Sequence, residues 1–233
     1  MLAPPLVLHS RRRMYVAYRP DCDVVHHLHP ELAVLAESWV KHTPKNSGDL
    51  PRLYALAFNI KQIIAEGVPG DFAELGVFRG NSAAVLAHYA RQHGRSVFLF
   101  DTFEGFAAKD LSRTDANKVR DFAATSVDMA REVAGDSQVV YVKGRFPETV
   151  NADTERRQYA VVHLDCDLYE PMIAGLRFFF PRLSPGGLLV IHDYGGAHWD
   201  GVKRAVDEFT TGINERLVQL PDKAGTAMLR KSA

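Results

Sequence analysis

The stretch that decides the fold is DFAELGVFRGNS, residues 71–82. Its first five residues predict a short apolar strand with a carboxylate, Glu74, near the end. Gly76 and Gly80 then predict a sharp turn before a helix that starts near Ser82. Glycines at the carboxyl end of a parallel strand let a ligand approach the backbone, and the following helix offers unpaired N–H groups. The stretch therefore predicts a small-molecule site, with a purely structural turn as the alternative.

The spacing of the two glycines argues against two common kinds of nucleotide-binding site. Gly76 and Gly80 do not form the G-x-G-x-x-G of a dinucleotide site, and no Gly-Lys-Ser/Thr follows to hold a triphosphate. A Glu-x-Gly-x-x-x-Gly turn is instead similar to the first motif of the class I S-adenosylmethionine methyltransferases. A nicotinamide dehydrogenase is correspondingly disfavoured.

Short apolar runs alternate with helical patterns along the rest of the chain. Strands are predicted over residues 71–75, 96–100, 139–142, 159–164 and 187–191. Helices are predicted over residues 82–92, about 114–133, 171–180 and 199–209, with a turn at 184–187. Nearly continuous apolar strands alternating with helices predict a Rossmann-like, doubly wound parallel sheet of the α/β class. Segments 217–220 and 226–229 would add two antiparallel strands and bring the sheet to seven.

The first 66 residues differ from the rest and predict a helical extension or lid on a core formed by residues 67–233. They contain two amphipathic helical patterns, over residues 31–41 and 50–66. Such an extension either caps the ligand face or forms a dimer contact. The histidines at 26, 27 and 29 lack cysteine or carboxylate partners at ligand spacing, so a solvated or interface loop is predicted there rather than a metal site.

The composition predicts a single enzyme-sized domain with a small-molecule partner. The chain has 233 residues, 46% of them hydrophobic, and its 28 Lys and Arg balance 28 Asp and Glu. Zero net charge gives no field that would recruit nucleic acid or an anionic membrane. Two cysteines are too few for a disulfide scaffold, and the basic run at residues 11–13 follows an apolar stretch instead of preceding it, unlike a secretory signal. A cytoplasmic protein is expected.

The second and third strands end in residues suited to a nucleoside. Asp101 follows the apolar run of the second strand, where a carboxylate can accept hydrogen bonds from both ribose hydroxyls. The alternative is that Asp101 only caps the next turn. After the third strand, Gly144 would let a flat ring lie against the backbone, and Phe146 could pack beside it.

The fourth and fifth strands end in an acidic cluster. Asp165 and Asp167 follow one strand, and His192 and Asp193 follow the next. Parallel neighbours bring these groups to one edge of the sheet, where carboxylates repel unless a cation or shared protons compensate them. Oxygen ligands favour Mg²⁺ or Mn²⁺, whereas a histidine nitrogen better suits Mn²⁺, Fe²⁺ or Zn²⁺. The alternative is that Asp165 and Asp193 cap the segments that follow them and that Asp167 faces water.

Taken together over roughly residues 50–210, these motifs resemble the macrocin O-methyltransferase (TylF-type) family of sugar O-methyltransferases. The resemblance implies metal-dependent transfer of a methyl group from S-adenosylmethionine to a hydroxyl of a glycoside or other natural product, in an enzyme that is expected to be a homo-oligomer. The positions that match the cofactor site are Glu74, Gly76, Val77, Gly80, Asn81, Ser82, Asp101, Thr102, Phe103, Gly144, Phe146 and Asp165.

The resemblance also implies a metal triad like that of catechol O-methyltransferase, formed here by Asp165, His192 and Asp193. His192 departs from the family, which more often has a second aspartate there. It is expected to be a metal ligand, a general base or a partner of the backbone, in that order. Asp165 and His192 are the predicted catalytic residues, with Mg²⁺ as the expected ion and Mn²⁺ as an alternative.

Two other functions remain open from the sequence. A catechol or phenolic O-methyltransferase would use the same geometry on a flat acceptor, and a non-catalytic S-adenosylmethionine-binding protein could have kept the fold. Tyr169, Tyr194 and Trp199 are predicted either to line the acceptor pocket, because aromatic side chains stack on sugar rings, or to pack in the core.

Overall fold

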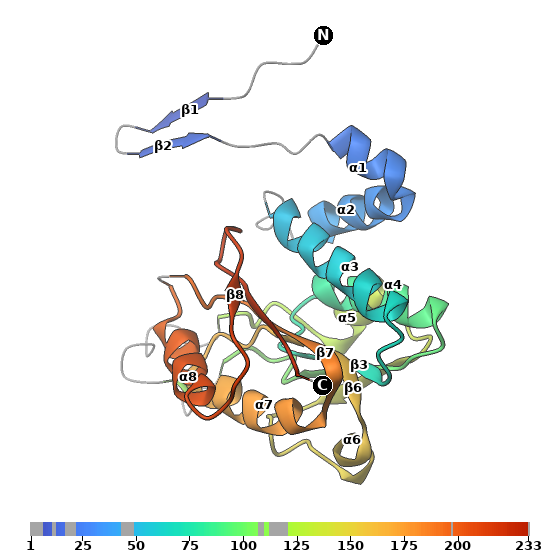
Figure 1. Ribbon diagram of the computed structural model, residues 1–233, viewed down its shortest axis with the longest axis vertical. Helices are drawn as coiled ribbons and strands as arrows, with labels where there is room; N and C mark the ends of the chain where they lie inside the picture. Colours follow the sequence, from blue (N-terminus) through green and yellow to red (C-terminus); the bar gives the residue numbers. More distant parts are fainter. Residues whose placement is uncertain are drawn as a thin grey trace.

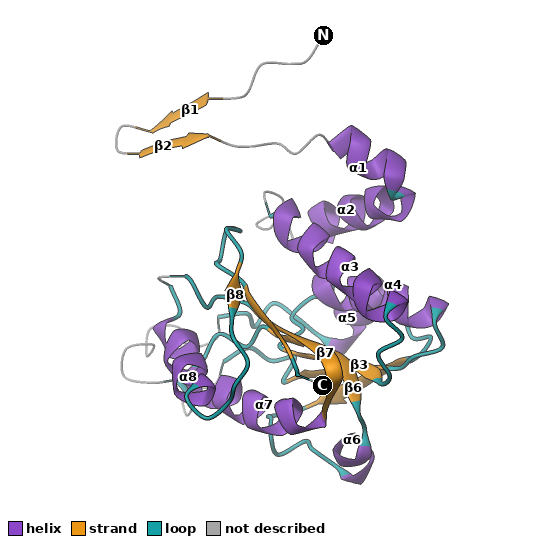
Figure 2. Ribbon diagram, viewed as in Figure 1, coloured by secondary structure: helices purple, strands orange, loops and turns teal. Residues whose placement is uncertain are grey.

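A seven-stranded sheet forms the centre of the computed structural model, which describes residues 7–10, 13–16, 22–42, 49–106, 110–111, 121–196 and 198–232 (Figures 1 and 2). The strands are β3 (Asp71–Leu75), β4 (Val97–Asp101), β5 (Val139–Lys143), β6 (Tyr159–Leu164), β7 (Leu183–Ile191), β8 (Val218–Gln219) and β9 (Ala227–Arg230). Their order is β5-β4-β3-β6-β7-β9-β8. The first five run parallel, and β9 is antiparallel to both β7 and β8. The predicted α/β fold with two closing strands is confirmed.

Alternate residues of each central strand face opposite layers of the core. Val97 and Leu99 of β4 pack with one apolar cluster, whereas Phe98 and Phe100 pack with the other. This period of two is the pleat of a strand that is buried on both faces. The chain therefore forms three layers, with the sheet between two sets of helices.

The helices divide between the two faces of the sheet. One cluster contains side chains of α2 (Pro30–His42), α3 (Leu50–Ala65), α4 (Asn81–Gln92) and α5 (Val127–Ala134). The other contains side chains of α7 (Tyr169–Arg182) and α8 (Asp200–Thr210). Because α2 and α3 share the core cluster of β3 and β4, both are packed into the same core as the sheet. None of the helices in the described segments is long and apolar enough to cross a membrane.

The N-terminal region differs in part from its prediction. A hairpin of β1 (Val7–Ser10) and β2 (Arg13–Val16) precedes α1 (Cys22–Leu28). The prediction of a loop at the histidine run is therefore wrong for His26 and His27, which lie in the last turn of α1. His26 Nε2 lies 3.0 Å from the hydroxyl of Tyr54, so α3 provides a partner that the local sequence does not reveal.

Two other predicted segments also need correction. The turn predicted at residues 184–187 belongs to β7, because the N–H of Gly186 donates to the carbonyl of Lys231 and the N–H of Lys231 donates to that of Gly187. Of the helix predicted over 114–133, residues 112–120 lie outside the described part, and residues 121–126 form turns and bends. The helix begins at Val127 because the Ser126 hydroxyl accepts the N–H of Met129 and caps it. The short helix α6 (Ala152–Arg156) was not predicted.

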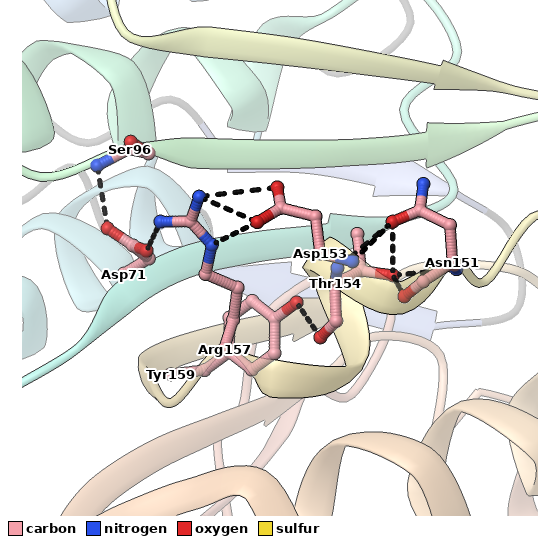
Figure 3. A network of polar contacts seen from close by, with 7 residues as sticks. All are labelled: Asp71, Ser96, Asn151, Asp153, Thr154, Arg157 and Tyr159. Carbon is pink, nitrogen blue, oxygen red and sulfur yellow. Dashed lines mark hydrogen bonds and ion pairs between the residues drawn. The ribbon is translucent and has the colours of Figure 1, made fainter.

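A polar network fastens the amino ends of β3 and β4, opposite the edge at which these strands end (Figure 3). Asp71 accepts the N–H of Ser96 at 2.9 Å and a hydrogen bond from Arg157 at 3.1 Å. Arg157 also donates to Asp153, in the first turn of α6. Because these groups satisfy one another, this edge is closed by structural contacts.

Candidate active site

A cavity of about 1430 Å³ opens at the carboxyl ends of the parallel strands. Eleven of the predicted site residues line it: Gly76, Val77, Asn81, Ser82, Asp101, Thr102, Gly144, Phe146, Asp165, His192 and Asp193. Glu74, Gly80 and Phe103 do not. Ligands of open α/β sheets bind in the crevice outside the carboxyl ends of the strands, so this cavity is the candidate active site.

Asp101 holds together the two turns that flank the cavity. Its Oδ2 atom accepts the N–H groups of Val77 and Phe78 at 2.7 and 2.8 Å, and its Oδ1 atom accepts that of Phe103 at 2.7 Å. Asp101 therefore caps the turn that follows β4, whether or not it also binds a ligand. A carboxylate has about four acceptor sites, and the Thr102 hydroxyl also lies 3.4 Å from Oδ1, so a ligand hydroxyl would have to replace this long contact, and ribose binding stays a prediction.

The first glycine of the turn is required by a neighbouring strand as well as by its backbone angle. Gly76 has φ of +88°, and a Cβ there would lie 2.0 Å from the carbonyl oxygen of Asp165. Gly80 precedes α4 in the left-handed region, with φ of +87°. The turn around Gly76 thus packs directly on the backbone that carries Asp165.

Glu74 lies beneath the turn and outside the cavity. It is fully buried, and its Oε1 atom lies 2.7 Å from Nδ1 of His163. Burial raises the pKa of Glu74 well above its usual value, and burial together with the nearby Arg52 lowers the pKa of His163 to about 4. This placement favours a structural role for Glu74 beneath the loop, and contact with the cofactor stays a prediction.

The acidic edge brings the predicted triad together. Asp165, His192 and Asp193 each offer a donor atom, and these atoms lie within 4.8 Å of one another. Asp167 is also buried beside them. Neighbouring parallel strands therefore gather these groups as the sequence predicted.

Arg52 also lies in this cluster, and the sequence reasoning missed it. Its Nη1 atom lies 2.5 Å from Nε2 of His192, and its Nη2 atom donates to Oδ2 of Asp165 at 2.9 Å. The guanidinium is buried and lies 5.3 Å from the ring centre of Trp39. Arg52 precedes the buried Leu56 and Ile60 at helical spacing on α3. A cation in that otherwise apolar stripe is the signal that could have identified it.

Aromatic side chains form part of the cavity wall. Phe106 and Phe122 lie with ring centres 5.7 and 6.2 Å from that of Trp199, and all three line the cavity. Trp199 therefore lies where it was predicted. Tyr169 and Tyr194 do not line the cavity, because their hydroxyls donate to Glu208 and Asp207.

Residues 47–227 match the family described as Macrocin-O-methyltransferase (TylF). The chain belongs to this family. It is 35% identical to 8-demethyl-8-(2,3-dimethoxy-alpha-L-rhamnosyl)-tetracenomycin-C 4'-O-methyltransferase of Streptomyces olivaceus over 192 residues, which are 75% of this chain and 69% of that protein. It is 28% identical to Mycinamicin III 3''-O-methyltransferase of Micromonospora griseorubida over 78% of this chain and 77% of the relative.

A solved structure agrees with this family assignment. The O-methyltransferase NovP superposes with a TM-score of 0.67 and 25% identity, covering 78% of this chain and 80% of that one. The chain is thus an O-methyltransferase with the class I fold, and its methyl donor is S-adenosylmethionine. The family, fold and activity implied by the sequence motifs are confirmed.

The ring of His192 in this enzyme is neutral and uses both nitrogens. Burial lowers its pKa well below the usual value, and Arg52 lowers it further. Since a guanidinium can only donate, Nε2 of His192 accepts from Arg52, and Nδ1 carries the proton towards Oγ1 of Thr226, 3.2 Å away. Neither ring nitrogen is left with an open lone pair.

The two remaining carboxyl groups are held close to each other. Burial and the charge of Asp165 raise the pKa of Asp193 to about 7. Burial, Asp165 and Asp193 raise the pKa of Asp167 well above its usual value. The pair therefore holds a proton more readily than isolated carboxyl groups would, which relieves the repulsion that the sequence predicted.

The donor set in this arrangement does not fit a divalent ion. An ion bound by the triad would need the Nε2 lone pair of His192 and an oxygen of Asp165. Arg52 already donates to both residues, and an imidazole nitrogen has only one lone pair. Asp165, His192 and Asp193 converge as the family resemblance implies. The positive charge that contacts both Asp165 and His192 is the guanidinium of Arg52.

Proposed function

We propose that this enzyme transfers the methyl group of S-adenosylmethionine to a hydroxyl of a sugar in a glycosylated natural product. The carrying observation is that one cavity is lined both by the turn at Gly76 and by the acidic edge at Asp165. Its volume of about 1430 Å³ exceeds the roughly 300–1,000 Å³ of common ligand pockets, which leaves room for an acceptor beside the cofactor. Relatives named for O-methylation of a rhamnosyl derivative of tetracenomycin C and of mycinamicin III support this acceptor class.

The chemical step is an in-line displacement at the sulfonium methyl. The acceptor oxygen forms a bond to the methyl carbon as the carbon–sulfur bond breaks, and the electron pair stays on sulfur in S-adenosylhomocysteine. The enzyme must hold the oxygen about 3 Å from the methyl group and accept its proton. Asp165 receives that proton, since its carboxylate faces the cavity with 19% of the side chain exposed.

The Mg²⁺ or Mn²⁺ expected from the sequence is untested, and the contacts of Arg52 with Asp165 and His192 argue against it. A divalent ion held by Asp165, His192 and Asp193 would lower the pKa of the acceptor hydroxyl. The proton transfer described above uses residues of this chain alone. A cytoplasmic location, a homo-oligomeric state and a lid formed by residues 1–66 also stay predictions. The presence of Asp49 and Arg52 in the cavity wall supports the lid.

Acceptor profiling tests the proposal. The enzyme would be incubated with S-adenosylmethionine and matched panels of deoxysugar glycosides, their aglycones and catechols, and products would be identified by mass spectrometry. We expect methylation only of glycosides, at a sugar hydroxyl. Methylation of catechols alone would favour the phenolic alternative, and tight cofactor binding without any transfer across the panels would favour the non-catalytic one.

A further inference from the structure

Arg52 is buried where charge is costly, and its contacts explain why it is stable there. It comes from α3, more than a hundred residues before its partners, and its side chain is only 6% exposed. The fork of the guanidinium meets the carboxylate of Asp165 with one nitrogen and the ring of His192 with the other. A buried arginine of this kind requires a compensating anion, and the acidic edge supplies it.

The two contacts of Arg52 fulfil the roles that a divalent ion would have at this site. An ion would neutralise the carboxylate, fix the ring of His192 and place a positive charge next to the acceptor oxygen. Arg52 neutralises Asp165, fixes Nε2 of His192 and lines the same cavity. Because both cations need the same lone pair of His192, one excludes the other.

We propose that Arg52 takes the place of a divalent ion in this enzyme, as a positioning residue that holds Asp165 and His192 in the geometry for methyl transfer without metal. The inference rests on the proposed methyl transfer for its catalytic part. The exclusion of metal by Arg52 follows from the contacts alone and can be tested separately. This arrangement gives a physical reason for histidine at position 192, where the family more often has a second aspartate. The neutral ring of His192 accepts a hydrogen bond from the guanidinium of Arg52, and a metal site rich in carboxylates would not need that guanidinium.

Arg157 provides a matched control within the same chain. Like Arg52, it contacts two side chains, because it donates to Asp71 and Asp153 (Figure 3). It also lies over an aromatic ring, that of Phe98, at 5.0 Å. It differs in place, because it lies at the amino edge of the sheet and outside the cavity. Arg157→Met therefore removes a similar cation without touching the site.

The first experiment measures metal binding without any turnover. Chelator-treated wild-type enzyme, Arg52→Met and Arg157→Met would be titrated with Mn²⁺ and followed by electron paramagnetic resonance and calorimetry. We expect no stoichiometric Mn²⁺ on the wild type or on Arg157→Met. Arg52→Met should bind one Mn²⁺ at least about tenfold more tightly than the wild type does. This gain in affinity should disappear when Asp193→Asn is added to Arg52→Met.

Specific results would overturn the exclusion of metal. One equivalent of Mn²⁺ on the wild type, lost in Asp193→Asn, would contradict it. So would a folded Arg52→Met enzyme that gains no Mn²⁺ binding. Circular dichroism and thermal unfolding would establish folding, because removal of Arg52 leaves Asp165 uncompensated. If Arg52→Met does not fold, the wild-type titration alone decides.

The second experiment tests the positioning role with the accepted glycoside. Wild-type turnover should be unchanged by EDTA. Arg52→Met should lower kcat about a hundredfold with little change in the KM for S-adenosylmethionine, and added Mn²⁺ should restore part of it. Arg52→Lys should retain more activity than Arg52→Met, and Arg157→Met should match the wild type. Loss of wild-type turnover in EDTA, or an unchanged kcat in Arg52→Met, would contradict the positioning role of Arg52. A wild type that methylates none of the glycosides would instead contradict the proposed function, and the Mn²⁺ titration would still test the exclusion of metal.

Discussion

The donor side and the acidic edge of the same cavity are built in different ways. On the donor side, backbone N–H groups of Val77, Phe78 and Phe103 meet a single carboxylate, Asp101. At the acidic edge, side chains from three separate parts of the chain meet one another, with Arg52 from α3 among them. The donor side is therefore fixed by local backbone geometry, and the acidic edge by long-range charge compensation.

Because the two regions are built differently, different substitutions should damage each of them. A backbone-built turn depends on residues that allow its dihedral angles, and it keeps its shape when most side chains change. A cluster of buried charges depends on every partner, because removal of one leaves another uncompensated. Changes at the acidic edge should therefore affect turnover most, and changes on the donor side should affect cofactor affinity or folding.

The largest effect is expected at Asp165, the proposed proton acceptor. Asp165→Ala should lower kcat by about a thousandfold or more while leaving S-adenosylmethionine affinity nearly unchanged, because it removes the base and not the donor turn. Asp193→Ala should also lose turnover, since it breaks the adjoining carboxyl pair. Single-turnover assays and calorimetry would separate the two quantities. Unchanged turnover in both variants would mean that the acidic edge is not catalytic.

The second-largest effect is expected at Gly76, a donor-side residue that packs against the backbone of Asp165 at the acidic edge. Gly76→Ala should lower the free energy of unfolding by at least about 2 kcal/mol, because the new Cβ would meet the Asp165 carbonyl in addition to adopting a positive φ. Gly94→Ala is the matched control, with φ of +64° and nothing within 4 Å of the added carbon. Urea unfolding of both variants would measure the difference. Equal losses would show that the approach to Asp165 is not what requires glycine.

The third effect is confined to the donor side. Asp101→Ala should weaken S-adenosylmethionine binding about tenfold to a hundredfold, because it releases the N–H groups that shape the turn and removes the predicted ribose acceptor. Asp71→Asn is the control, since Asp71 also accepts a backbone N–H but at the opposite edge of the sheet. Calorimetry showing unchanged affinity in Asp101→Ala would contradict the ribose assignment.

The same contrast explains what the sequence could predict. The turn after β3, the carboxylate after β4 and the acidic residues after β6 and β7 each follow an apolar strand, so local pattern and parallel pairing locate them. The pairing of Gly186 with Lys231 and the contact of Arg52 with Asp165 join distant segments, and no local pattern encodes them. The family resemblance implied that Asp165, His192 and Asp193 converge, as they do, but it could not show that an arginine from α3 contacts two of them.

The smallest effect concerns the far end of α3, where Arg230 of β9 forms a bidentate pair with Glu66. Hydrogen bonds from Arg230 and Gln62 lower the pKa of Glu66 to about 2. A depressed carboxyl pKa contributes stability above the unfolded value near 4.5 and loses it as the pH falls towards 2.

Glu66→Gln should therefore lower Tm by less than about 2 °C at pH 7, because the pair is exposed and screened by water and salt. The difference from wild type should shrink as the pH falls below about 4.5, and kcat at pH 7 should be unchanged. Thermal unfolding from pH 7 to pH 3 would measure this. A large loss of kcat in Glu66→Gln would mean that the position of Arg52 depends on the distal anchor of its helix, and would join the acidic edge to the surface of the protein.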